Sequence, residues 1–185
     1  MKKFLSLFFL LFAIQLQAQE RLICRNASVR FFSKMPLENI EAVNNQGLSV
    51  IDPKSGNIEF SVLLKSFIFP NALMQEHFNE NYVESSKYPR AYFKGAIQSM
   101  PVINFSQSSD YSFLVKGTLQ LHGVIKEMTA TAKLHIKEGV ITGETQFDLA
   151  LEDYAIDIPK LVKDKISPKI QIQVKAIYQI QKPNL

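Results

Sequence analysis

The sequence contains no tryptophan and only one cysteine, Cys24. A single cysteine excludes an intramolecular disulfide. A cysteine near the start of an exported protein can carry a lipid when a small residue precedes it, but Ile23 stands before Cys24. We therefore expect Cys24 to be an unmodified strand residue that packs as a small hydrophobe.

The sequence has one long apolar run, and that run lies at its N-terminus. Lys2 and Lys3 precede apolar residues 4–14, and the polar stretch 15–19 follows. This order is typical of a secretory signal peptide, and the run is shorter than the roughly 20 apolar residues needed to cross a bilayer. We expect residues 1–18 to be removed after Ala18, so that residues 19–185 form one exported domain without a lipid anchor.

Charge of one sign is not concentrated anywhere in the chain. The 21 Lys and Arg residues are scattered among 17 Asp and Glu residues. Without tryptophan, and with only six tyrosines, the sequence lacks the basic stripe with interleaved aromatic residues that nucleic-acid binding requires. Nucleic acid is therefore not an expected partner.

Patterns that support catalysis or metal binding are also scarce. His77, His122 and His135 fall on three different predicted elements, and none has the neighbours of a known zinc motif. Three acidic residues lie close together without a partner base or nucleophile, namely Glu152, Asp153 and Asp157. We expect no catalytic residues, no metal and no cofactor.

Alternation of apolar and polar residues is the dominant pattern, and it predicts β-strands. The clearest strand is the last one, whose inward series is Ile170, Ile172, Val174, Ala176, Tyr178 and Ile180. Further strands are predicted near residues 29–33, 40–51, 58–64, 91–97, 112–121, 128–136 and 147–151. Turn residues separate several of them, at 52–57, 122–123 and 137–139.

One segment favours a helix. Residues 71–83 lack β-branched residues until their end, and Asn71 is a suitable N-cap. Leu73, His77 and Phe78 fall on one helical face, which Tyr82 continues. A second helical turn is expected at 158–165, where Pro159 suits the first position.

Eight antiparallel strands predict an all-β fold that closes as an up-and-down barrel. Residues 168–181 would extend roughly 46 Å, well beyond the usual 17–20 Å or so, so the barrel is expected to be elongated. Ala91, Gly95, Gly117 and Ala176 would leave room beside large inward residues. Periodicity is equally compatible with a sandwich whose core is filled by side chains.

Several motifs resemble the YceI-like family of bacterial periplasmic proteins. They are residues 73–78 (LMQEHF), 88–93 (YPRAYF) and 117–124 (GTLQLHGV), and Phe147 leading to Asp153-Tyr154. The resemblance covers essentially all of residues 19–185. It implies an extended eight-stranded lipocalin-like barrel with one or two short helices. It also implies that a polyisoprenoid or related amphiphilic lipid, and not a cofactor, occupies the interior, so a bound isoprenoid or fatty-acid-like lipid is expected.

The resulting prediction is an exported lipid-binding protein that acts as a carrier, buffer or scavenger and is not an enzyme. Its partner is a hydrophobic or amphiphilic small molecule, and contact with a membrane or a membrane protein is expected to be transient. His77 and Arg90 are candidates to orient a head group. The alternatives are an interaction scaffold with a dry core and, less favoured, a small lipid-modifying enzyme. The candidate ligand-binding residues are Phe60, Val62, His77, Phe78, Arg90, Phe93, Leu119, Phe147, Leu149, Ile172, Val174 and Tyr178.

Overall fold

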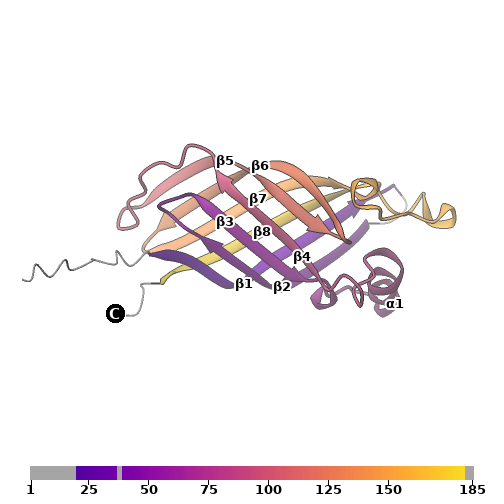
Figure 1. Ribbon diagram of the computed structural model, residues 1–185. Helices are drawn as coiled ribbons and strands as arrows, with labels where there is room; N and C mark the ends of the chain where they lie inside the picture. The colour runs from indigo at the N-terminus through magenta and orange to yellow at the C-terminus, as the bar shows by residue number, and fades with distance from the viewer. Residues whose placement is uncertain (1–19, 37–38, 182–185) are drawn as a thin grey trace, which may run out of the picture.

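The computed structural model describes residues 20–36 and 39–181. The predicted signal peptide, residues 1–18, lies outside the described residues. Eight strands follow one another around a closed antiparallel barrel, and the last strand pairs with the first (Figure 1). The prediction of a closed barrel is therefore confirmed, and the sandwich alternative is wrong. Within the described ranges, no helix is both long enough and apolar enough to cross a membrane.

The strands are long, and each is paired with its neighbours in the chain. Strand β8 has 13 residues, which extend about 43 Å at about 3.3 Å per residue. The strands are β1 (Arg21–Lys34), β2 (Asn39–Ile51), β3 (Asn57–Leu63), β4 (Arg90–Ile97), β5 (Ser109–Leu121), β6 (Val124–Lys137), β7 (Val140–Ala150) and β8 (Lys169–Gln181).

Strand β1 begins eight residues before the predicted start because a β-bulge hides its alternation. Cys24 and Ala27 are both buried, although three positions separate them. Opposite them, Ser49 and Gly47 are only two positions apart. The extra residue in β1 shifts the inward series by one place, so the pattern in the sequence becomes regular only from Val29 onwards.

The predicted helix begins where expected but is shorter and changes geometry. Asn71 accepts hydrogen bonds from the backbone N–H groups of Leu73 (2.8 Å) and Met74 (3.3 Å), which confirms it as the N-cap. Helix α1 (Ala72–His77) continues as a π-helical turn, η2 (Phe78–Tyr82). Its Phe78 packs among Phe31, Phe67 and Phe69 with ring centroids 5.0–5.6 Å apart, and this cluster joins α1 to the barrel.

Three short 3₁₀ turns complete the fold, namely η1 (Leu64–Ser66), η3 (Leu151–Tyr154) and η4 (Lys160–Val162). The predicted second helical turn is confirmed as η4, although it is shorter than expected and Pro159 is its N-cap. Figure 1 shows α1 and the segment that carries η4 at the same end of the barrel, opposite the end where β8 finishes.

The hairpin between β5 and β6 is fixed by a histidine. His122 and Gly123 both have positive φ, 51° and 77°, as a two-residue type I′ turn requires. The His122 ring is 12% exposed, and its Nε2 lies 2.7 Å from Glu84 Oε2. Its Nδ1 lies 3.0 Å from the carbonyl oxygen of Tyr154. One side chain thus joins this hairpin to the segment after η2 and to η3.

This arrangement predicts that His122→Asn will destabilise the protein. Asparagine tolerates positive φ, so the turn is retained, but its short side chain cannot reach both partners. We expect a loss of about 1–3 kcal/mol in the free energy of unfolding, measured by urea denaturation.

His135→Asn is the matched control. His135 Nδ1 also lies 2.7 Å from a carboxylate, that of Asp110, but its side chain is 38% exposed. Exposed pairs contribute about 0–1 kcal/mol, so the control should lose less than His122→Asn. Equal losses in the two variants would contradict the structural role assigned to His122.

Candidate functional site

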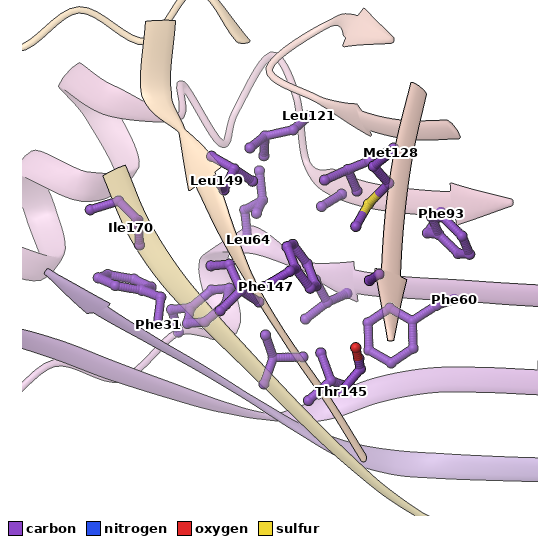
Figure 2. Close-up of a pocket in the computed structure, with 18 of the residues that line it drawn as sticks. Phe31, Phe60, Leu64, Phe93, Leu121, Met128, Thr145, Phe147, Leu149 and Ile170 are labelled. Atoms are coloured by element: carbon purple, nitrogen blue, oxygen red, sulfur yellow. The ribbon is translucent and has the colours of Figure 1, made fainter. Parts of the chain in front are cut away.

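The interior of the barrel holds a cavity of about 530 Å³. Sites for small molecules are typically about 300–1,000 Å³, so this volume suits a ligand. Apolar side chains dominate its wall, and Figure 2 shows Thr145, Phe147 and Leu149 in a row along β7, facing the interior. Met128 and Phe93 lie across the cavity from them in the same view.

The cavity passes through two apolar clusters. The first, near α1, includes Phe31, Leu64 and Ile170. The second includes Leu22, Ile97 and Leu134. Residues of both clusters line the one cavity, so the empty space is elongated along the barrel instead of being confined to one end.

Almost all of the predicted ligand-binding residues line this cavity. They come from seven elements, and the barrel brings them together: Phe60, Val62, His77, Phe78, Phe93, Leu119, Phe147, Leu149, Ile172, Val174 and Tyr178. His77 is exposed at the end of α1 and lines the outermost part. That these residues contact a ligand remains a prediction.

Arg90 is placed differently from the expectation. Among the described residues it is absent from the cavity lining, because its neighbour Ala91 faces inward and successive strand residues face opposite ways. Arg90 is exposed at the start of β4. Arg90 therefore does not line the cavity itself, and its role in orienting a head group at the mouth near the helix stays a prediction.

The sequence analysis missed many lining residues, including all those of β1, β2 and β6 and the first half of β7. Met128, Ala130 and Thr145 all contribute to the wall. Met128 and Ala130 could have been identified from the alternation of apolar residues at positions 128, 130 and 132 in β6. Thr145 was missed because β7 begins at Val140, seven residues before its predicted start, and its first half contains Gly143 and several polar residues.

Polar groups in the wall are few, and the two deepest hydroxyl groups are hydrogen-bonded to each other. Tyr178 Oη lies 2.8 Å from Ser49 Oγ. Burial raises the pKa of Tyr178 to about 12, so its hydroxyl remains protonated at physiological pH. Nearer the α1 end, Ser33 Oγ accepts a hydrogen bond from the backbone N–H of Ser167 at 2.9 Å.

The cavity reaches the surface at the end that carries α1. There its lining includes Leu73 and His77 from α1, and Val162, Lys165 and Ile166 from the segment around η4. Leu73 is 57% exposed. This mouth combines exposed apolar side chains with a few polar groups, as small-molecule sites commonly do.

A lateral gap between β6 and β7 forms a second approach. In the described part of the chain the two strands pair from Ala132–Thr145 to Lys137–Val140 and no further. Beyond this point residues 124–131 pair with β5, and residues 146–150 pair with β8. Lys133 and Glu144, which occupy outward positions at the gap, also line the cavity, so the cavity extends to the outer surface there.

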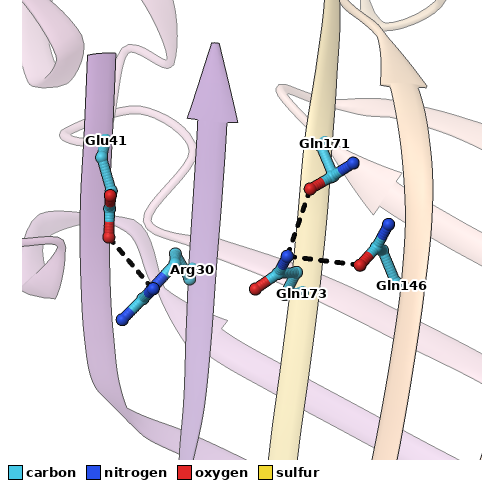
Figure 3. A network of polar contacts seen from close by, with 5 residues as sticks. All are labelled: Arg30, Glu41, Gln146, Gln171 and Gln173. Carbon is cyan, nitrogen blue, oxygen red and sulfur yellow. Dashed lines mark hydrogen bonds and ion pairs between the residues drawn. The ribbon is translucent and has the colours of Figure 1, made fainter. Parts of the chain in front are cut away.

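Polar contacts lie on the outer face of β1, β2, β7 and β8. Arg30 of β1 forms an ion pair with Glu41 of β2, with 3.0 Å between Nε and Oε1. Gln173 Nε2 donates to the side-chain oxygens of Gln146 (3.2 Å) and Gln171 (3.1 Å) (Figure 3). The apolar lining of the cavity belongs to the inner face of the barrel.

No metal-binding cluster is present in the portion that the structure describes. There, no three histidine, cysteine or acidic residues come together in a group that could hold a metal ion. Cys24 is buried in the barrel beside Ala27 and Ala176.

Comparison with known proteins gives one family and several similar folds. The model of the YceI-like domain matches residues 25–177. A polyisoprenoid-binding domain from Saccharophagus degradans, implicated in plant cell wall breakdown, is 15% identical with a TM-score of 0.76, covering 89% of this chain and 100% of that one. Burkholderia cenocepacia BcnA is also 15% identical, with a TM-score of 0.67 and coverages of 83% and 96%.

A third solved structure, the YceI protein of Campylobacter jejuni, is 17% identical with a TM-score of 0.54, covering 75% of this chain and 81% of that one. No curated protein matches the chain. At these identities the structural likeness establishes the fold.

A substitution on β8 distinguishes a cavity from a filled core. Val174 lines the cavity, so we expect Val174→Trp to place its indole in empty space. The delipidated variant should then lose less than the 1–3 kcal/mol or so of unfolding free energy that overpacking a filled core costs. Ile177→Trp is the matched control on the outer face of β8, where Ile177 is 56% exposed. A loss of about 1–3 kcal/mol or more for Val174→Trp, without a similar loss for the control, would contradict the cavity.

Proposed function

The chain belongs to the YceI-like family, and we propose that it binds one long apolar chain of an isoprenoid or similar amphiphile inside its barrel. The observation that carries this proposal is the elongated apolar cavity, which runs through both clusters and opens at the α1 end. A fold relative named as a polyisoprenoid-binding domain adds support.

We propose that the protein carries, buffers or scavenges this lipid. Each methylene gains about 0.8 kcal/mol on leaving water, but a lipid of this kind leaves a bilayer, where that gain already exists. The net free energy of transfer into the barrel is therefore small. Small differences in packing along the cavity decide loading and release, which suits reversible exchange.

The side chains inside the cavity support binding rather than catalysis. Ser49 is hydrogen-bonded to Tyr178, and Ser33 accepts a backbone N–H. Neither serine is placed beside a histidine or carboxylate by these bonds, as an activated nucleophile would be. We accordingly propose no catalytic residue for this site.

We also propose that the protein is exported to the periplasm and has no lipid anchor. The pattern of residues 1–18 motivates export. The side chain of Cys24 is 2% exposed and faces the barrel interior, which supports the absence of an acyl group on its sulfur. Transient contact with a membrane would take place at the mouth, where Leu73 is exposed.

Transfer between vesicles tests the proposed function. Delipidated protein is added to donor vesicles that contain a labelled polyprenyl alcohol and to unlabelled acceptor vesicles. We expect the wild type to accelerate transfer and to retain label after repurification, whereas Val174→Trp should do neither because the indole occupies ligand space. Ile177→Trp, which changes the outer face, should behave like the wild type. Transfer by the wild type equal to that without protein would contradict the proposal.

A further inference from the structure

Tyr178 lies partway along the cavity, at the near edge of the second apolar cluster. It packs against the second apolar cluster and also against the small cluster of Cys24, Ala27 and Ala176. Residues that line the cavity lie on both sides of it, from Val174 and Ile172 towards α1 to Leu22 and Ile97 at the other end. An apolar chain that enters at the α1 end must pass Tyr178 to reach the second cluster.

The Tyr178 ring is held by two contacts, one on each side of β8 around the barrel: Ser49 lies on β2 and Gly143 on β7. Its hydroxyl is fixed by Ser49 at 2.8 Å. On the adjacent strand, a Cβ built at Gly143 would lie 2.8 Å from Cε2 of this ring, and the three atoms nearest to that Cβ all belong to Tyr178. The ring therefore fills the space that any side chain at position 143 would need.

The backbone does not require glycine at position 143. Gly56, Gly123 and Gly139 have positive φ values of 76–79°, whereas Gly143 lies within β7 and is not among the residues with positive φ. Its Cβ would meet a side chain and not the main chain. Phe60 and Phe93 also pack on glycines, but a Cβ at Gly47, Gly95 or Gly117 would approach a backbone oxygen within 2.4–2.9 Å. Position 143 therefore isolates the effect of the ring.

We propose that Gly143 and Tyr178 determine how far an apolar chain extends along the barrel, and hence the longest chain that the protein binds. This inference rests on the proposed function. With glycine at 143 the ring stays beside the wall and the passage to the second cluster is open. A side chain at 143 would displace the ring into the passage and exclude the far end of a long ligand.

Three variants test this proposal with saturated primary alcohols of graded length as the probe. Delipidated protein is equilibrated with a mixture of the alcohols, and the bound fraction is extracted and identified by mass spectrometry. We expect Gly143→Ala to shift the bound alcohols to shorter chains, with about fourfold weaker binding for each methylene excluded. Tyr178→Ala should shift them to longer chains.

The double variant Gly143→Ala/Tyr178→Ala decides whether the ring mediates the effect. With no ring to displace, it should bind the same lengths as Tyr178→Ala. Thr142→Ala, a change at the neighbouring outward position, is the matched control and should leave the distribution unchanged. Tyr178→Phe keeps the ring but removes the bond to Ser49, and a shift to shorter chains would support the anchoring role of that bond.

The outcomes separate this proposal from the function on which it rests. Identical chain lengths in the wild type, Gly143→Ala and Tyr178→Ala would overturn the length proposal while the proposed function stands. A wild type that binds none of the alcohols would overturn both. If Gly143→Ala fails to fold, folding of the double variant supports the ring contact, and Tyr178→Ala alone then tests chain length.

Discussion

The width of an eight-stranded barrel is the constraint on which the rest of this structure depends. Such a barrel is only just wide enough for its own side chains or for one small ligand. Any inward aromatic ring therefore competes with a ligand for the same space. Here large rings are placed over glycines: Phe60 over Gly47, Phe93 over Gly95 and Gly117, and Tyr178 over Gly143. Because the rings lie close to the wall, space along the barrel remains open.

The same constraint explains the chemistry of the cavity. A narrow interior lined mainly by apolar side chains favours a flexible hydrocarbon chain over a bulky or polar molecule. Its deepest hydroxyls, on Tyr178 and Ser49, are hydrogen-bonded to each other. Burying them beside an apolar ligand therefore leaves no polar group without a partner and adds little unfavourable free energy to binding. Polar groups such as His77 and Lys165 line the mouth, where a head group would remain near water. The arrangement suits an amphiphile bound with its chain inward.

Much of the fold was predictable because alternation of apolar and polar residues is a direct consequence of strand geometry. The prediction failed where local features interrupt that alternation. The bulge between Cys24 and Ala27 concealed the start of β1, and the mixed composition around Gly143 concealed the start of β7. Arg90 was expected near the mouth of the barrel, and strand parity excludes its side chain from the cavity lining. The ring positions over the glycines and the gap beside Lys133 depend on pairing between distant strands, which the sequence pattern does not reveal.

Mass spectrometry of the purified chain under non-denaturing conditions, compared with the same sample after denaturation, tests the central claim most directly. The claim is that the barrel encloses a long-chain amphiphile without a covalent bond. It predicts a species heavier than the polypeptide by one such molecule, which disappears on denaturation and releases a lipid of that mass. A species with the mass of the polypeptide alone in both conditions, unchanged after incubation with a lipid extract, would contradict it.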